Sequence, residues 1–249
     1  MMDTIRTYGL NVEARVGAQY PDGDVCVVAI DGPSGTGKST VSRHLATAIG
    51  AHYLDTGAMY RAVTWAVLDA GVDPHDTNAV VGVVGKIKLS SGIDPEAPHI
   101  SVDGRPVDVE IRGPQVTGAV SIVAAVPAVR AALVDQQREI IRTAGRIVVE
   151  GRDISSVVAP DAQLKIYLTA SEAERARRRG VENAGGGRVS ASELAATQAD
   201  LARRDQLDSS RATAPLRRTD DAVEVDTTGL DIDGVVSVLQ SMLVGEATR

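Results

Sequence analysis

The 249-residue sequence contains no phenylalanine, one tryptophan and one cysteine, and no apolar run approaches the length of a membrane-spanning helix. Without phenylalanine, the core must be built from valine, alanine, isoleucine and leucine. The single cysteine excludes a disulfide within the chain, and its place in the segment VCVVAI predicts a buried thiol. The first residues lack the apolar core of a signal peptide. We therefore expect a flexible extension over residues 1–23 and a soluble, cytoplasmic protein.

Positive charge is also scarce. The chain has 26 lysines and arginines against 33 aspartates and glutamates, a formal net charge of −7. A protein with this balance does not bind nucleic acid through its overall field. We expect neither a nucleic-acid partner nor a membrane partner, and any anion must be bound by arginines that are grouped locally.

Apolar segments alternate with helical patterns along most of the chain, which predicts an α/β fold with a parallel sheet and right-handed connections. One of the helices begins at Pro127 and ends before Gly145. Ser171 with Glu174 and Ser190 with Glu193 predict two capping boxes. The expected strands cover residues 25–30, 51–55, 146–149, 164–168 and 223–227.

Residues 83–112 have a different texture, because apolar and polar residues alternate there. Within this segment Asp103-Gly104 is a strong signal for a two-residue hairpin. The pattern predicts a small antiparallel insertion in the α/β fold.

A complete phosphate-loop pattern, Gly-x-x-x-x-Gly-Lys-Ser, follows the first apolar strand and precedes a helix. In such a loop, backbone N–H groups surround phosphate oxygens and the helix N-terminus adds partial positive charge. Lys38 would reach the β- and γ-phosphates, and the Ser39 hydroxyl would bind Mg²⁺. The predicted nucleoside triphosphate site comprises Gly32, Pro33, Ser34, Gly35, Thr36, Gly37, Lys38, Ser39 and Thr40.

Charged residues also gather at a second strand end, where VVEGRD closes an apolar run. Ligands of open α/β sheets bind beyond the carboxyl ends of the strands, so residues 150–153 are expected at a ligand. Glu150 would order Mg²⁺ through water. Further along, Arg204, Asp208 and Arg211 fall at i, i+4 and i+7, on one helical face. This ladder either binds a ligand or only supports its helix.

Several motifs together resemble those of bacterial cytidylate kinases, which are P-loop nucleoside monophosphate kinases. They are AIDGPSGTGKST, YLDTGAMYRA, EGRDI, RRDQLDSSR and VDTTGLDIDGVV, in this order from about residue 25 to 244. The resemblance implies Mg²⁺- and ATP-dependent phosphorylation of CMP and dCMP by an enzyme that is usually monomeric. It also implies a P-loop core with a five-stranded parallel sheet. A kinase domain over residues 24–249 would carry an acceptor-binding insertion at about 83–112 and an arginine-rich lid at about 175–190.

The resemblance also implies roles by position. Arg61, Arg152 and Arg211 would hold the acceptor phosphate, Arg204 and Asp208 the ribose, and Ser121, Arg130 and Asp153 the cytosine. The full implied CMP set is Thr56, Tyr60, Arg61, Ser121, Arg130, Gly151, Arg152, Asp153, Arg204, Asp208 and Arg211. A carboxylate suits the N4 amine of cytosine and would face a carbonyl in uracil, which favours cytosine.

The implied catalytic group is Lys38, Arg152, Arg178 and Arg179, and Arg175 and Arg188 resemble further lid residues. A phosphate oxygen of CMP is already ionised near neutral pH, so no general base is needed, and catalysis depends on positioning and charge neutralisation. Two alternatives remain. One is a monophosphate kinase with UMP or a broader acceptor range, and the other is a P-loop switch that uses ATP only to change shape.

Overall fold

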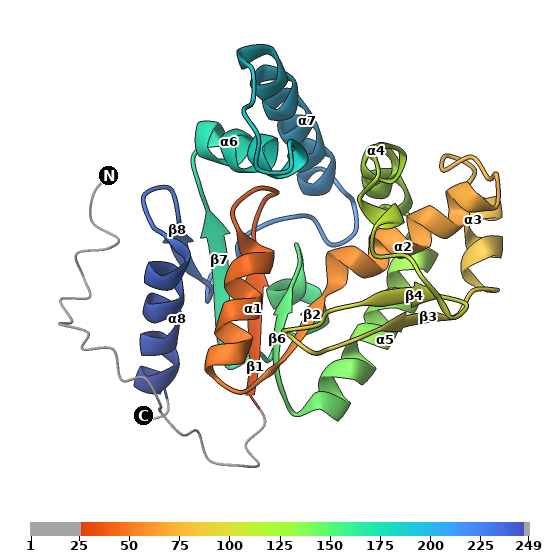
Figure 1. Cartoon of the computed structure of the whole chain (residues 1–249). Coiled ribbons are helices and arrows are strands. Elements are labelled where there is room, and N and C mark those ends of the chain that lie inside the picture. The colour runs from red at the N-terminus through yellow and green to blue at the C-terminus, as the bar shows by residue number, and fades with distance from the viewer. Residues whose placement is uncertain (1–25, 247–249) are drawn as a thin grey trace.

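The computed structural model describes residues 26–246, so the expected extension at residues 1–23 lies outside the described part of the chain. Its centre is a five-stranded parallel sheet with the strand order β2-β6-β1-β7-β8 (Figure 1). The predicted fold class is confirmed. The strands are β1 (Cys26–Asp31), β2 (His52–Asp55), β6 (Arg146–Glu150), β7 (Leu164–Thr169) and β8 (Val223–Asp226).

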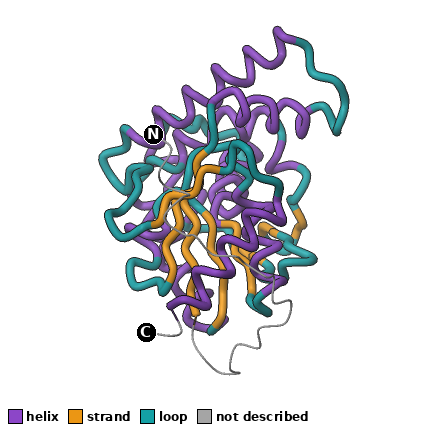
Figure 2. Tube along the Cα trace, turned by 90° about the vertical axis from the view of Figure 1, so that its left-hand side faces the viewer, coloured by secondary structure: helices purple, strands orange, loops and turns teal. Residues whose placement is uncertain are grey.

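Helices cover both faces of this sheet, as Figure 2 shows from the side. Alternate residues of β1 therefore belong to two different cores. Val27 and Ala29 pack into the core on one face, and Val28 and Ile30 pack into the core on the other face. Burial on both faces explains why the strands are continuous apolar runs. One face packs on α1 (Lys38–Ala48) and α8 (Ile232–Glu246); the other packs on α2 (Thr56–Asp69), α3 (Thr77–Val84), α4 (Pro114–Val123) and α5 (Pro127–Ala144).

The sole cysteine is only half-buried, so the prediction of a buried thiol is wrong. Cys26 is the first residue of β1 and packs against the core beneath α1 and α8 while part of its surface stays exposed. In the described residues no single helix has the length and apolar character to cross a membrane. Only α4 and α5 taken together pass that test, and a bend of 97° separates them.

The expected antiparallel insertion forms a three-stranded sheet of β3 (Leu89–Ser91), β4 (Ile100–Val102) and β5 (Arg105–Pro106). Asp103 and Gly104 connect β4 to β5 with φ angles of 52° and 80°. Two successive positive φ angles are those of the hairpin turn that matches strand twist, so the hairpin prediction is confirmed. A short 3₁₀ turn, η1 (Glu110–Arg112), leads from this sheet to α4.

Two helices, α6 (Glu172–Asn183) and α7 (Ala191–Ser209), pack together above the carboxyl edge of the large sheet (Figure 1). The capping box of Ser190 and Glu193 is formed as predicted. The one expected at Ser171 is only half formed: the Ser171 hydroxyl accepts the Glu174 N–H, but the Ser171 N–H donates to Thr228 Oγ1 at 2.9 Å. The Glu174 carboxylate turns to neighbouring arginines because a full charge binds it more strongly than a backbone amide.

A cavity-forming substitution in the core tests this packing. Leu239 of α8 is 0% exposed, so Leu239→Ala should lower the free energy of unfolding by about 2–5 kcal/mol. Its neighbour Val238 is 37% exposed, and Val238→Ala should change the free energy of unfolding by less than about 0.5 kcal/mol. Urea unfolding of both variants measures the difference; equal effects would contradict the placement of α8.

Candidate active site

The phosphate loop runs from the end of β1 into α1 and lies directly against its neighbours. Gly32 has a φ of 147°, and a Cβ atom at this position would lie 2.2 Å from the Leu168 carbonyl oxygen of β7. A Cβ on Gly35 would lie 2.9 Å from the carbonyl oxygen of Arg175 in α6. Side chains are excluded at both points, so the glycines let the loop pass between β7 and α6.

Lys38 is folded over this loop. Its Nζ donates to the carbonyl oxygens of Gly32 and Pro33, each at 2.7 Å. Burial lowers the pKa of Lys38 below its ordinary value, and the nearby charge of Arg152 lowers it further. The ammonium group is thus held at the mouth of the loop, in an environment that a bound anion would make more favourable.

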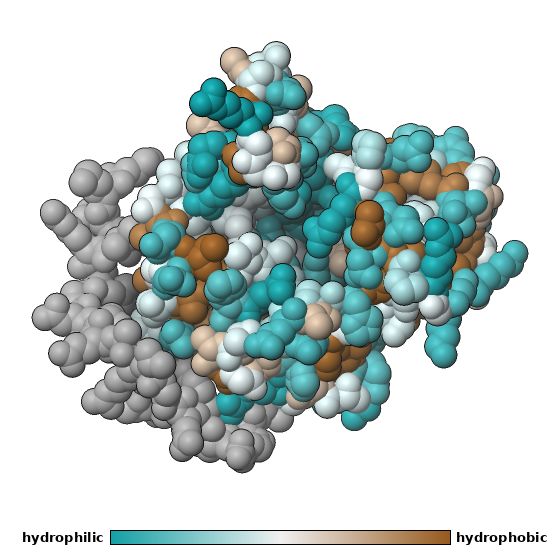
Figure 3. All heavy atoms as spheres, viewed as in Figure 1, coloured by the Kyte–Doolittle hydropathy of each residue, from teal (hydrophilic) through white to brown (hydrophobic). Residues whose placement is uncertain are grey.

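A cavity of about 1640 Å³ opens beside the phosphate loop, bounded by α2, α4, α6, α7 and the turn after β8. Figure 3 shows the surface hollowed between the upper lobe and the lobe on the right. Burial and repulsion from neighbouring arginines lower the pKa of Arg61 and of Arg204 to about 10 each. Such a concentration of positive charge suits a polyanionic ligand. The basic side chains in its wall are Lys38, Arg61, Arg112, Arg152, Arg177, Arg178, Arg179 and Arg204.

Most of the predicted triphosphate residues line this cavity together with part of the predicted acceptor set. Arg152, which follows β6, joins the two. Its Nη1 donates to Gly32 O at 2.6 Å, and its Nε pairs with Asp208 of α7 at 2.7 Å. The predicted residues in the wall are Ser34, Gly35, Thr36, Gly37, Lys38, Ser39, Thr40, Arg61, Glu150, Gly151, Arg152, Arg178, Arg179 and Arg204.

The remaining acceptor residues form a buried group next to this cavity. Its centre is the ion pair of Arg130 with Asp153, whose side chains are 3% and 5% exposed. The Arg130 guanidinium lies over the Tyr60 ring, 5.3 Å from its centroid. Ser121 is also buried. A donor and an acceptor are therefore held side by side in a dry environment, which can recognise a polar edge.

Thr56 and Arg211 connect this group to the surrounding backbone. Thr56 Oγ1 donates to the Glu150 carbonyl oxygen at 2.7 Å, and Arg211 Nε donates to the Asp208 carbonyl oxygen at 3.1 Å. The expectation that Arg211 shares a helical face with Arg204 and Asp208 is wrong, because α7 ends at Ser209. Arg211 reaches the same region from the segment that follows the helix.

Glu150 ends β6 and is almost fully buried. Burial and the charge of Asp55 raise its pKa, while the positive charge of Lys38 and hydrogen bonds from Tyr53 and Ser39 oppose the rise. Residues 26–246 contain no group of three or more His, Cys, Asp and Glu that could hold a metal ion. One carboxylate beside one hydroxyl nevertheless fits Mg²⁺, which takes few protein ligands when it is bound with substrate phosphates.

The comparison with known families agrees with this geometry. The family model described as Cytidylate kinase matches residues 28–243. The chain belongs to the cytidylate kinase family. It is 55% identical to a cytidylate kinase of Rhodococcus opacus (strain B4), with 86% of this chain and 92% of the relative covered. It is also 55% identical to one of Nocardia farcinica (strain IFM 10152), with 87% and 93% covered.

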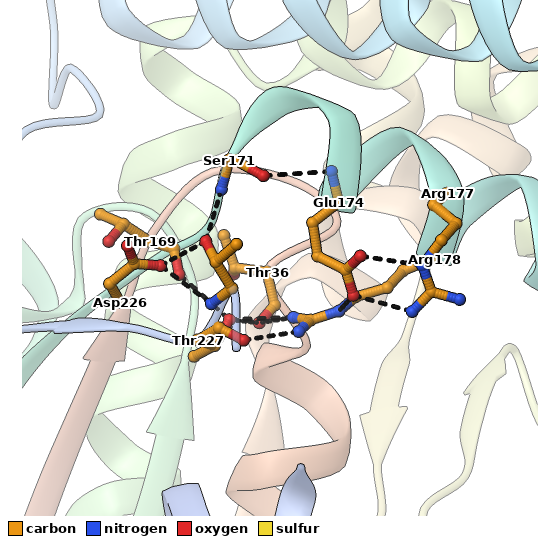
Figure 4. Close-up of polar contacts among 9 residues, drawn as sticks. Thr36, Thr169, Ser171, Glu174, Arg177, Arg178, Asp226 and Thr227 are labelled. Carbon is orange, nitrogen blue, oxygen red and sulfur yellow. Dashed lines mark hydrogen bonds and ion pairs between the residues drawn. The ribbon is translucent and has the colours of Figure 1, made fainter. Parts of the chain in front are cut away.

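The lid residues that the family resemblance implies are not equivalent to one another. Arg178 donates through Nη1 to Thr36 O at 3.2 Å and through Nη2 to Thr227 O at 2.6 Å, and Glu174 holds its Nε (Figure 4). Arg179 pairs with Glu182 at 3.0 Å. Arg188 is exposed. Arg178 thus joins α6 to the phosphate loop and to Thr227, the residue that follows β8.

Two aspartates that the sequence analysis did not single out organise the loops of the site. Asp31 accepts the backbone N–H groups of Ile154 and Ser155, both at 2.8 Å, and so shapes the turn η2 (Ile154–Val158) that follows Asp153. Asp205 accepts the Ser34 N–H at 3.3 Å. Asp31 stands at a strand end beside the phosphate loop, a position that could have drawn attention; Asp205 carries no comparable signal.

Removing one partner of the buried ion pair should be costly. Asp153→Asn leaves the Arg130 charge buried without its counter-charge, and we expect the free energy of unfolding to fall by about 3–5 kcal/mol. Glu139→Gln breaks the exposed pair of Glu139 with Arg142 and should leave stability almost unchanged. Thermal and urea unfolding of the two variants make the comparison, and a wild-type curve for Asp153→Asn would contradict the role of the pair.

Proposed function

We propose that the protein transfers the γ-phosphoryl group of ATP to CMP or dCMP, which yields CDP or dCDP and ADP. The observation that carries this proposal is the meeting of two anion-binding sets in one cavity. The phosphate loop with Lys38 forms one set, and arginines from α2, from the end of β6 and from α7 form the other. Membership of the cytidylate kinase family supports the same conclusion.

The reaction requires two polyanions to lie end to end. We place ATP on residues 32–40 and the phosphate of CMP against Arg61, Arg152 and Arg211. An ionised oxygen of that phosphate forms the new bond to the γ-phosphorus, the bond to the bridging oxygen of ADP breaks, and ADP leaves. Guanidinium groups offset the repulsion between the reactants, and no proton has to be removed.

The buried group next to the cavity suits the nucleoside. Arg130 has five donors, of which the described contacts use one on Asp153 and one on the Ala124 carbonyl oxygen, so donors remain for the O2 and N3 acceptors of cytosine. Asp153 would accept the N4 amine, with Ser121 and Tyr60 beside the base and Thr56 and Gly151 nearby. We assign the ribose to Arg204 and Asp208. Since Asp208 also holds Arg152, sugar and phosphate recognition share one residue.

Mg²⁺ would be held by Ser39 and Glu150 together with the phosphates of ATP. When bound, the ion neutralises charge on the β- and γ-phosphates. Glu150 is buried beside Asp55, and a cation there favours its ionised form.

We infer that the lid over residues 175–190 closes on the donor and excludes water. Arg178 would keep the base of the lid attached to the phosphate loop, and Arg179 would contact the transferred phosphoryl group. The insertion at about 83–112 would complete the acceptor side of the kinase domain, residues 24–249. We expect a monomer that acts in the cytoplasm, where free ATP and CMP occur, and that has neither a nucleic-acid nor a membrane partner.

Release of ADP that depends on the acceptor tests the proposed function. We expect rapid ADP release in a coupled assay with ATP, Mg²⁺ and CMP or dCMP, much slower release with UMP or AMP, and almost none without an acceptor. Equal rates with UMP would indicate a broader monophosphate kinase. Hydrolysis that ignores every acceptor would contradict the proposal and favour a P-loop switch.

The lowered pKa of Lys38 predicts how binding of ATP depends on pH. The triphosphate binds the protonated form of Lys38. In the free protein burial lowers the pKa of Lys38, so the side chain loses its proton at a pH lower than its ordinary pKa of 10.5. Between the lowered pKa and 10.5, binding takes up a proton, so affinity should fall as pH rises, by at most about tenfold per pH unit. Calorimetry without Mg²⁺ measures this slope. Lys38→Arg should flatten it, because a guanidinium stays charged; a flat wild-type profile would contradict the assignment.

A further inference from the structure

Each polar group of Ser34 in the phosphate loop, namely its N–H, its carbonyl oxygen and its Oγ, forms a hydrogen bond with a charged side chain. Its N–H donates to Asp205 Oδ1 at 3.3 Å, its carbonyl oxygen accepts Arg175 Nη1 at 3.1 Å, and its Oγ accepts Arg152 Nη2 at 2.5 Å. The residue is 5% exposed. Three charged side chains from three different segments therefore determine where this one residue lies.

Two of these side chains form an ion pair with each other. Arg175 of α6 and Asp205 of α7 are in direct contact, and their side chains are 10% and 17% exposed. Each also bonds the Ser34 backbone, one at the carbonyl and one at the amide. The pair thus ties both lid helices to the phosphate loop, although Arg175 is not part of the cavity wall that Arg178 and Arg179 line.

The third side chain, Arg152, connects Ser34 to the part of the site that we assign to the acceptor. Arg152 bonds Ser34 Oγ and pairs with Asp208, which lies three residues after Asp205 on the same face of α7. Two carboxylates of one helix therefore each hold an arginine, and both arginines meet at Ser34. A displacement of Ser34 would be passed directly to the guanidinium of Arg152.

We propose that Asp205 and Arg175 are positioning residues, which fix Ser34 and, through it, the Arg152 guanidinium that faces the acceptor phosphate. The inference rests on the proposed function and extends it to residues that are expected to touch neither substrate. It accounts for a largely buried pair of opposite charges at the base of the lid, whose side-chain hydrogen bonds to the phosphate loop all go to Ser34. A misplacement of a reacting group by about 1 Å can lower a rate by about 100-fold.

Asp205→Asn tests the proposal. It removes the charge of Asp205 with little change in shape, and we expect kcat with ATP and CMP to fall by about 10- to 100-fold. Asp221→Asn is the matched control, because Asp221 is an exposed aspartate paired with Lys165 before β8, away from the cavity. Its kcat should equal that of the wild type. Equal kcat values for Asp205→Asn and Asp221→Asn would overturn the proposal.

A double-mutant cycle separates positioning from a general loss of structure. Ser34→Ala removes only the Oγ contact with Arg152. It therefore breaks the path of contacts from Asp205 through Ser34 to Arg152 at the Arg152 end, whereas Asp205→Asn breaks it at the Asp205 end. The double variant of Asp205→Asn with Ser34→Ala should be no slower than the slower single variant. If the two losses multiply, as they should for independent sites, the path through Ser34 is refuted.

Arg175→Lys provides a second route should Asp205→Asn fail to fold. Lysine keeps the charge but lacks the forked donors that hold Asp205 and the Ser34 carbonyl together. We expect Arg175→Lys to lower kcat by the same factor as Asp205→Asn, and the double variant with Ser34→Ala to be no slower than the slower single variant. A wild-type kcat for Arg175→Lys would overturn the proposal. A wild-type protein that releases no ADP with CMP would instead refute the proposed function. An active wild type with an equally active Asp205→Asn refutes only this inference.

Discussion

Pairing of arginines with aspartates that are buried or half-buried is the interaction on which the arrangement of the site depends. Three such pairs, Arg130–Asp153, Arg152–Asp208 and Arg175–Asp205, join segments that are distant in the chain. A buried charge without a partner is strongly unfavourable, so each aspartate makes it possible to keep an arginine in place before any nucleotide binds. The result is a set of cationic groups that are already oriented, which reduces the reorganisation needed when two polyanions arrive.

The parallel sheet brings these pairs together. β1 and β6 are neighbours in register, with Ile30 beside Glu150, and the Gly151 N–H continues the ladder to the Ile30 carbonyl oxygen at 3.0 Å. The phosphate loop and residues 150–153 therefore leave the sheet side by side at its carboxyl edge. The residues predicted for the donor and for the acceptor share this edge because the carboxyl ends of parallel strands all lie on the same side of a sheet.

An acidic protein can still bind anions, because local placement of charge matters more than its sum. Arginines from α2, α6, α7 and the end of β6 converge on one cavity, while most exposed pairs, such as Glu139–Arg142, lie elsewhere on the surface. Burial lowers the pKa of Arg61 and of Arg204, and repulsion from neighbouring arginines lowers both further. Like charges repel one another in the free protein, and a bound polyanion relieves that repulsion.

Local patterns in the sequence determined the strands of the sheet, the phosphate loop, the Asp103-Gly104 hairpin and the cap at Ser190, since each depends on residues close together in the chain. They also placed charged residues at the correct strand ends. Only the tertiary structure decided which aspartate meets which arginine, that Arg211 lies beyond its helix, and that Arg175 turns to Ser34. Those outcomes depend on how α6 and α7 pack over the sheet, and contacts between residues that lie from 23 positions apart, as in Arg130–Asp153, to 141 positions apart, as in Ser34–Arg175, leave no periodic signal in a single sequence.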